Sequence, residues 1–72
     1  MTLRELLYVM HDDWRIAVTT PDDDVLYTGT RKSGRGGGIA PEYMERNVLK
    51  IYPDDSGKDA DFIIIIFDAQ TM

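Results

Sequence analysis

One segment of this 72-residue chain combines cations and glycines in a pattern that suits the binding of phosphate groups. Arginine and lysine neutralise phosphate charge, and glycine lets backbone N–H groups approach phosphate oxygens closely. Tyr27 and Tyr43 lie on flanking segments, and an aromatic ring beside Arg and Gly can stack on a nucleobase. We therefore predict a generic anion-binding segment made of Arg31, Lys32, Ser33, Gly34, Arg35, Gly36, Gly37 and Gly38.

Neither common nucleotide-binding motif is complete in this segment. Gly29 and Gly34 have the spacing of a P-loop, but Arg35-Gly36 stands where Lys-Ser or Lys-Thr is required. A dinucleotide fingerprint starting at Gly34 needs a glycine at the position of Ile39. The sequence therefore supports neither ATPase nor Rossmann chemistry. The alternative for residues 31–38 is a solvated, mobile connection that contributes nothing to the core.

Three acidic clusters form a second candidate feature. Asp12-Asp13, Asp22-Asp23-Asp24 and Asp54-Asp55 with Asp59 and Asp61 could together present a negative surface to a basic partner, in the manner of a DNA mimic. Each cluster also falls at a predicted turn, where Asp is favoured because its side chain bonds to the nearby backbone. The turn explanation accounts for all three clusters. The segment from Asp54 onward lacks the spacing of an EF-hand, so calcium binding is not expected.

The chain offers no set of residues for catalysis or metal binding. His11 is the only histidine and there is no cysteine, so a metal-ligand set is incomplete. His11 instead suits the C-terminal end of a helix, where a cation complements the dipole. The serines lie in predicted loops. We therefore expect a protein that is not an enzyme and that uses no metal or cofactor.

Composition limits the remaining possibilities. The chain has 8 Lys and Arg against 13 Asp and Glu, a formal charge of −5, which argues against general affinity for nucleic acid. It has room for a single domain, residues 1–72. The longest apolar run, Phe62 to Phe67, is far shorter than the roughly 20 residues that span a bilayer. With no cysteine, no signal peptide and no membrane anchor visible, we expect a cytoplasmic protein without a membrane partner.

The first ten residues have the pattern of an amphipathic helix with its own start signal. Thr2 is followed three positions later by Glu5, the capping-box arrangement. The apolar residues then recur on one helical face, namely Leu3, Leu6, Leu7 and Met10. The helix is expected to end at the polar residues His11 to Asp13.

The remaining elements complete an α+β fold. Alternating residues predict strands over 14–20 and 25–30 joined by the turn Pro21–Asp24, followed by the loop 31–38. A short helix over 40–47, with Asn47 as a left-handed stop, precedes strands over 48–52 and 60–67 with a turn at 53–59. We predict an N-terminal helix packed on a mostly antiparallel four-stranded sheet, with a short helix between strands two and three.

The last predicted strand has no polar face. Ile63, Ile64, Ile65 and Ile66 are consecutive, so this strand is either covered on both sides or lies at a subunit interface. Because a short chain with one convincing helix has little material to cover both faces, we expect a homo-oligomer. The competing interpretation is a central strand between the first helix and the middle segment.

Parts of the chain resemble a group of small phage proteins. Residues 2–7 (Thr-Leu-Arg-Glu-Leu-Leu), residues 26–30 (Leu-Tyr-Thr-Gly-Thr) and residues 48–51 (Val-Leu-Lys-Ile) are similar to accessory proteins of comparable length in phages and prophages of Firmicutes. The resemblance implies a binding protein that blunts host defence, either by sequestering a nucleotide signal or by occupying a defence protein. It implies no catalytic residues. Residues 31–38 are longer, richer in glycine and more basic than the resemblance leads us to expect.

These observations lead to three hypotheses. The first is a non-catalytic anti-defence binding protein that forms a homo-oligomer and holds an anionic, nucleotide-type ligand between subunits, at residues 31–38 with Tyr27 or Tyr43. The second is an acidic inhibitor that binds a host defence protein through Asp22–Asp24 in the host cytoplasm. The third is a small structural subunit that uses the strand Ile63–Ile66 for edge pairing in a larger assembly.

Overall fold

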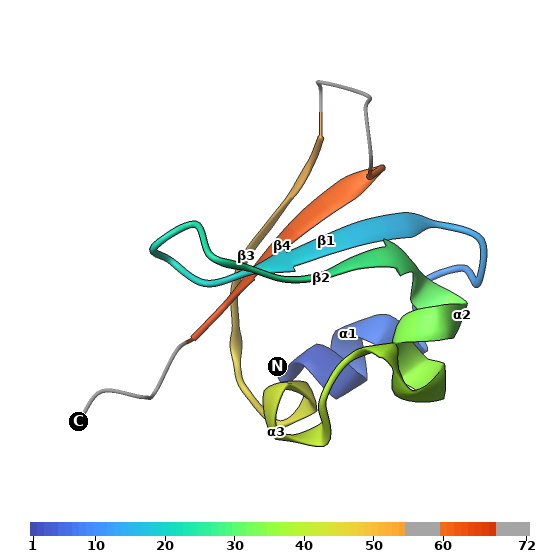
Figure 1. The fold of residues 1–72 in the computed structure, drawn as a ribbon, viewed down its shortest axis with the longest axis horizontal. Coiled ribbons are helices and arrows are strands. Elements are labelled where there is room, and N and C mark those ends of the chain that lie inside the picture. The colour runs from blue at the N-terminus through green and yellow to red at the C-terminus, as the bar shows by residue number, and fades with distance from the viewer. Residues whose placement is uncertain (55–59, 68–72) are drawn as a thin grey trace.

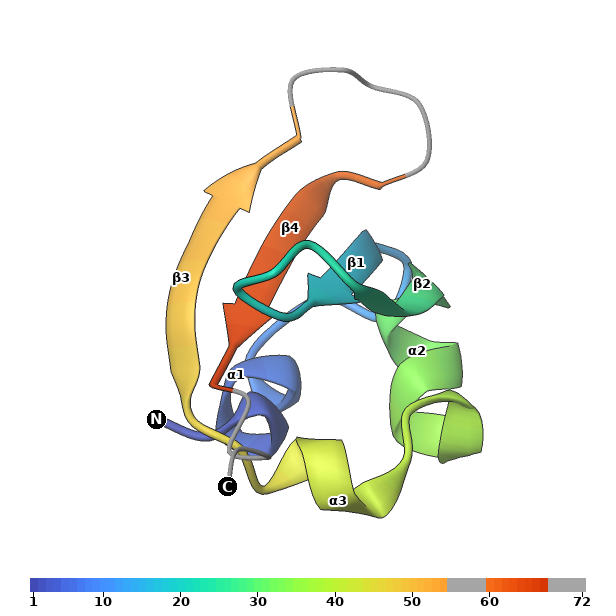
Figure 2. The ribbon, with the colours of Figure 1, turned by 60° about the vertical axis from the view of Figure 1, so that its left-hand side comes forward.

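The computed structural model describes residues 1–54 and 60–67, and it shows one sheet with helices gathered on one side of it (Figures 1 and 2). The fold is α+β, as predicted, with the N-terminal helix and a further helical segment between strands two and three. Most of the predicted turn at 53–59 lies outside the described residues. In chain order the elements are α1 (Leu3–Tyr8), β1 (Arg15–Thr19), β2 (Val25–Thr30), α2 (Arg31–Ser33), the π-helical turn η1 (Gly34–Gly38), α3 (Pro41–Met44), β3 (Val48–Pro53) and β4 (Phe62–Ile66).

The sheet has the strand order β2-β1-β4-β3. β1 pairs with β2 and β3 with β4 in antiparallel fashion, whereas β1 and β4 are parallel, so the prediction of a mostly antiparallel sheet is confirmed. β4 is a central strand, hydrogen-bonded on both sides. The hypothesis that Ile63–Ile66 forms an edge for pairing with a larger assembly is therefore wrong, because both of its edges are already occupied.

Helix α1 provides one wall of the core. Its capping box forms as predicted: the Glu5 N–H donates to Thr2 Oγ1 over 3.2 Å, and the Thr2 N–H donates to Glu5 Oε1 over 2.8 Å. The helix ends at Tyr8 with Val9 as its C-cap, so the predicted end at His11 to Asp13 and the placement of His11 at the helix C-terminus are wrong. Its apolar face packs against the inner face of the sheet in a single core made of Leu3, Leu7, Met10, Ile16, Val18, Ile39, Met44, Ile64 and Ile66.

Residues 31–38 form the short helix α2 and the turn η1, which is kinked at Gly37 (φ 119°, ψ −3°), and the prediction of a loop without core contacts is wrong. The Thr30 hydroxyl caps α2 by accepting the Ser33 N–H over 3.2 Å. The Arg31 N–H donates to the carbonyl of Trp14 over 2.8 Å, which ties the segment to the start of β1. Gly34 is buried and the Ile39 N–H donates to its carbonyl over 3.2 Å. The segment lacks apolar side chains, but its bare glycine backbone packs directly against the fold.

The predicted hairpin turn and the predicted stop of the short helix have different outcomes. The β1–β2 turn forms as predicted, with the Thr20 hydroxyl accepting the N–H groups of Asp22 and Asp24 over 3.2 Å each. Asp23 has a φ of 69°, and it is the one described non-glycine residue with a positive φ. The left-handed stop predicted at Asn47 is therefore wrong: α3 ends instead at Met44, and its C-cap Glu45 stays in the right-handed region.

Only one face of the sheet is covered by the described part of the chain. Ile64 and Ile66 in β4 are fully buried beneath the helices, whereas Ile63 and Ile65 point to the opposite side and are half-buried. All three helices and η1 lie on the Ile64 side (Figure 2). The uncovered side is called the open face below, and its central residues are Ala17, Thr19, Val25, Thr28, Lys50, Tyr52, Ile63 and Ile65.

Candidate functional site

Arg31, the first cation of the predicted anion-binding segment, is engaged within the chain. Its guanidinium forms an ion pair with the Asp12 carboxylate, and its side chain is only 11% exposed. The Lys32 N–H also donates to the Asp12 carbonyl over 3.2 Å, which fixes the Asp12 loop against α2. Arg31 therefore compensates a carboxylate of its own chain and positions this loop, and the net charge that it offers to a ligand is small.

Tyr27 is held against the glycines of the same segment. Its hydroxyl donates to the Thr30 carbonyl over 2.8 Å. A Cβ placed on Gly38 would lie 2.7 Å from Tyr27 Cε1, and one on Gly34 would lie 3.3 Å from Cε2. These distances show that the ring rests on bare backbone at both positions. Tyr27 is thus a partly buried packing residue whose ring lies against Gly34 and Gly38.

Tyr43, the other predicted stacking residue, lies on a different element. It sits on α3, which packs against α1, and its ring is partly buried beside the core. The guanidinium of Arg46 lies 5.4 Å from the centre of this ring. The structure therefore pairs Tyr43 with Arg46 and does not bring it together with the cations of residues 31–38.

A different tyrosine meets this segment. The Arg35 guanidinium lies 5.6 Å from the centre of the Tyr8 ring, within the range of a cation–π contact. Tyr8 is 72% exposed and its neighbour Val9 is 69% exposed. Gly36 and Gly37 of η1 are also exposed, and a Cβ placed on either of them would have no atom within 4 Å. We call these five residues the Tyr8 patch: Tyr8, Val9, Arg35, Gly36 and Gly37.

Lys32 and Ser33, on the turn before Arg35, are exposed next to this patch. Residues 31–38 are thus divided by the fold. Arg31, Gly34 and Gly38 have internal contacts, whereas Lys32, Ser33, Arg35, Gly36 and Gly37 face solvent.

Sequence reasoning missed Tyr8, although a signal was present. Tyr8 lies one position after Leu7 and off the stripe of leucines that faces the core. An aromatic residue on the polar side of an amphipathic helix is not needed for core packing, so its presence there indicates contact with something else. Only the fold shows that Arg35, 27 positions later, lies over its ring.

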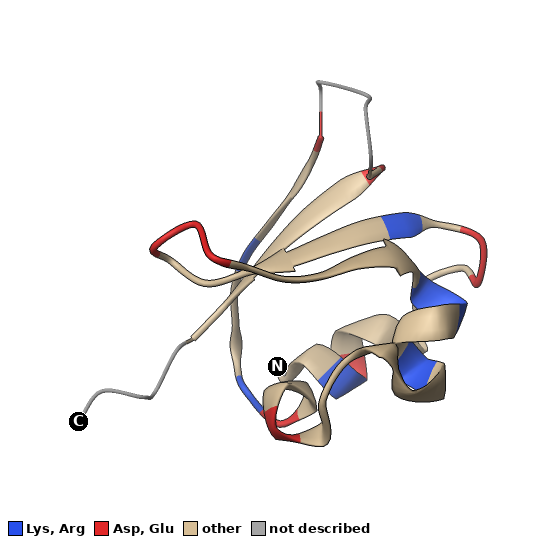
Figure 3. Cartoon of the chain, in the orientation of Figure 1, with Lys and Arg blue, Asp and Glu red and all other residues tan. Residues whose placement is uncertain are grey.

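Two of the three acidic clusters are well separated, and Asp55 and Asp59 of the third lie outside the described residues. Asp12-Asp13 and Asp22–Asp24 lie at opposite ends of the β1–β2 hairpin (Figure 3). Five residues of β1 separate them, about 17 Å of extended chain. Asp12 is paired with Arg31, and Asp22–Asp24 form the hairpin turn. The geometry therefore supports the turn explanation over a DNA-mimic surface for these two clusters.

The described part of the chain contains neither a pocket nor a group of three residues that could hold a metal ion. None of its helices is long and apolar enough to cross a membrane. Comparison of the chain with models of protein families, with curated proteins and with solved structures finds no match.

Proposed function

We propose that this chain is a non-catalytic binding protein that engages a protein partner through the Tyr8 patch. The observation that carries the proposal is the contact between two exposed side chains, Tyr8 at 72% exposure and the Arg35 guanidinium above its ring. Tyrosine and arginine are the residues that most often dominate the energy of protein interfaces. Here the pair is arranged before binding, so little side-chain freedom remains to be lost on docking.

The shape of the surface favours a protein over a free small molecule. Small-molecule sites are concave and bury most of their ligand, whereas the described residues form no pocket. An exposed patch with an aromatic anchor and open backbone at Gly36 and Gly37 suits a protein surface. With the resemblance to phage accessory proteins, the proposed partner is a host defence protein, bound and blocked without chemistry.

A nucleotide-type anion is the second candidate, and one observation favours it. Lys32 and Arg35 are exposed beside Gly36 and Gly37, and Tyr8 supplies the stacking ring that Tyr27 and Tyr43 do not. Because the described residues form no pocket, a second subunit would have to provide the other wall of such a site. This version keeps the ligand between subunits in a homo-oligomer.

The two candidates are separated by a paired experiment. Tyr8→Ala/Arg35→Ala removes the patch, and Tyr52→Ala/Lys50→Ala removes a matched aromatic and cation from the open face. If the proposal is correct, the wild type and the matched control capture the same host proteins, and the patch variant does not capture them.

Calorimetric titration with a panel of linear and cyclic nucleotides provides the second measurement. Saturable nucleotide binding that the patch variant lacks would overturn the protein-partner proposal in favour of the second candidate. If the patch variant matches the wild type in both assays, the Tyr8 patch is not the functional surface.

A further inference from the structure

The open face carries an apolar centre that nothing in the described chain covers. The strand register places Thr28, Ala17, Ile63 and Tyr52 in one row across all four strands. The adjacent row is Val25, Thr19, Ile65 and Lys50. Val25 on β2 is 62% exposed and Tyr52 on β3 is 40% exposed, whereas between these outer strands Ile63 and Ile65 are half-buried and Thr19 is 9% exposed. A sheet face with this composition ordinarily packs on another layer.

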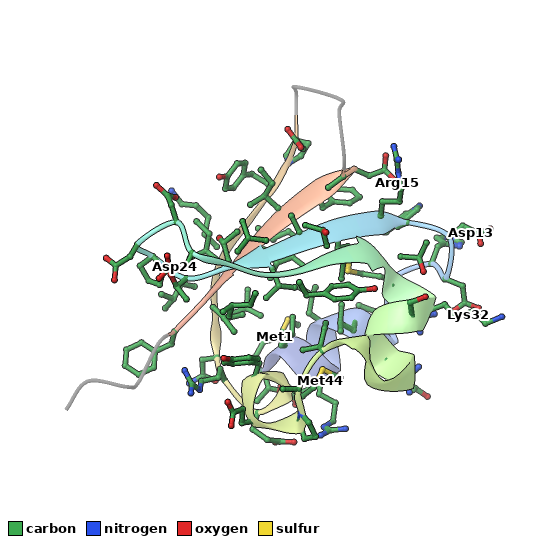
Figure 4. All side chains as sticks on the ribbon, viewed as in Figure 1. Met1, Asp13, Arg15, Asp24, Lys32 and Met44 are labelled. Carbon is green, nitrogen blue, oxygen red and sulfur yellow. The ribbon has the colours of Figure 1, made fainter. Side chains whose placement is uncertain are left out.

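Charged residues mark the two ends of this face. Arg15 begins β1 at one end, next to Asp61 just before β4; the Arg15 N–H donates to Asp61 Oδ2 over 3.0 Å. Both side chains are exposed. At the other end lie Lys50 on β3 and the acidic hairpin tip Asp22–Asp24 beside β2. Figure 4 shows Arg15 and Asp24 at opposite ends of the sheet.

We propose that the open face is covered by the open face of a second copy of this chain. A two-fold axis parallel to the strands sets β1 of one copy over β4 of the other and β2 over β3. In this arrangement Ala17 packs on Ile63 of the second copy, and Thr19 on its Ile65. The central apolar rows of the two copies are then buried against each other in an aligned sandwich.

The end charges specify this orientation. The same axis places Arg15 opposite Asp61 of the second copy, and by symmetry Asp61 opposite its Arg15. It also places the acidic hairpin tip near Lys50 of the second copy. The alternative two-fold axis, perpendicular to the strands, would set Asp61 against Ile65 of the other copy and bury a carboxylate on an apolar side chain. Charge complementarity thus selects the first arrangement.

Edge-to-edge pairing through β3 is disfavoured by the same structure. At one end of this edge strand the Val48 N–H already donates to the Met1 carbonyl over 2.8 Å. At the other end Pro53 has no N–H to donate. Lys50 lies between them on an exposed strand, a common device against edge pairing. A second copy therefore finds few free backbone partners on β3.

The size of the face predicts a weak dimer. Four strands about 4.8 Å apart and about 20 Å of strand length give roughly 400 Å² per copy. Stable complexes bury about 800 Å² per partner, so we expect a dissociation constant between about 10 μM and 1 mM. This inference does not depend on the Tyr8 patch, which lies on the helical side and stays exposed in the dimer.

Two single charge reversals test the proposal without disturbing the core. Arg15→Glu replaces the cation at this end of the face, where Asp61 and Asp54 also lie, and Asp61→Arg places a second cation beside Arg15. Each variant alone should dimerise at least about tenfold more weakly than the wild type, because like charges then oppose each other at both symmetric contacts. An equal mixture of the two variants should recover association as a heterodimer.

Sedimentation velocity from about 10 μM to 1 mM measures these equilibria, with circular dichroism confirming that each variant folds. The matched control Lys32→Glu, the same charge change on the helical side, should dimerise like the wild type. In wild-type spectra recorded by nuclear magnetic resonance, concentration-dependent shifts should fall on Ala17, Ile63 and Ile65 and spare Tyr8. A wild type that stays monomeric throughout, or a mixture that associates no better than its components, would overturn the proposal.

Discussion

Substitution of Gly38 by alanine tests whether the glycines of residues 31–38 serve packing or merely flexibility. A Cβ on Gly38 would lie 2.7 Å from Tyr27 Cε1 and 2.9 Å from the Ser33 carbonyl oxygen. Real Cβ atoms essentially never approach other atoms this closely. Tyr27 is tied by its hydroxyl to the Thr30 carbonyl, and the Ser33 oxygen belongs to the helical backbone, so neither neighbour can move away freely.

The expected cost follows from these two clashes. Overpacking of a constrained site costs about 1–3 kcal/mol, and the loss of glycine's unfolded-state freedom returns roughly 0.5 kcal/mol. We therefore expect Gly38→Ala to lower the free energy of unfolding by about 2 kcal/mol. For a chain of 72 residues the total is about 4–11 kcal/mol, so the midpoint of thermal unfolding should fall by about 10 °C.

Gly36→Ala is the matched control. Gly36 also lies in η1, and a Cβ placed on it would have no atom within 4 Å. The substitution should leave stability unchanged or raise it by up to about 1 kcal/mol. Urea denaturation followed by circular dichroism measures both variants. If Gly38→Ala and Gly36→Ala unfold within about 0.5 kcal/mol of each other, residues 31–38 do not pack as described and the interpretation as a solvated connection stands.

Further predictions concern the helix cap, the Arg31 ion pair and the patch. Thr2→Ala should cost about 1 kcal/mol in urea denaturation by removing the cap of α1; an unchanged midpoint would contradict it. The hydrogen bond from the Thr2 backbone N–H, chiefly, holds the pKa of Glu5 below its ordinary value of 4.5. Ionised Glu5 therefore stabilises the fold above about pH 4.5, and this stabilisation is lost as the pH falls through the lowered pKa of the folded state. Glu5→Gln should flatten the dependence of the unfolding free energy on pH in this acid range. Asp12→Ala should cost about 1–3 kcal/mol by leaving the buried Arg31 unpaired, whereas Arg31→Met should stay within about 1 kcal/mol of the wild type; the reverse order would refute this account of the pair. Tyr8→Ala should leave the unfolding midpoint unchanged, because the ring is 72% exposed.

Local signals made the element order predictable from the sequence. The Thr2 and Glu5 spacing fixed the start of α1, and the cap forms through neighbours three positions apart. Pro21–Asp24 marked the first hairpin for the same reason, since the turn is closed by hydrogen bonds from within a few residues. These features depend on short-range geometry, which the residue types carry with them.

The candidate site was only partly predictable. Its composition marks residues 31–38 as unusual, but a segment without apolar side chains has the pattern of a loop. Glycine has no side chain to reveal that its backbone will be packed against a ring, so the role of Gly34 and Gly38 depends on where Tyr27 lies. Likewise the residue type of Arg31 suggests that it could bind phosphate. The fold instead pairs its guanidinium with Asp12, which lies 19 positions away in the sequence.

The sequence by itself determined the class of fold, the order of its four strands, the start of the N-terminal helix and the presence of one apolar strand with no polar face. The tertiary structure alone decided that β4 runs parallel to β1, which joins Arg15 to Asp61 across 46 positions and leaves one face of the isoleucine strand open. It also decided that Tyr8, and neither Tyr27 nor Tyr43, meets Arg35. The physical reason is that strand pairing and the burial of apolar surface over long sequence separations are set by the packing of the whole chain, and no local pattern encodes them.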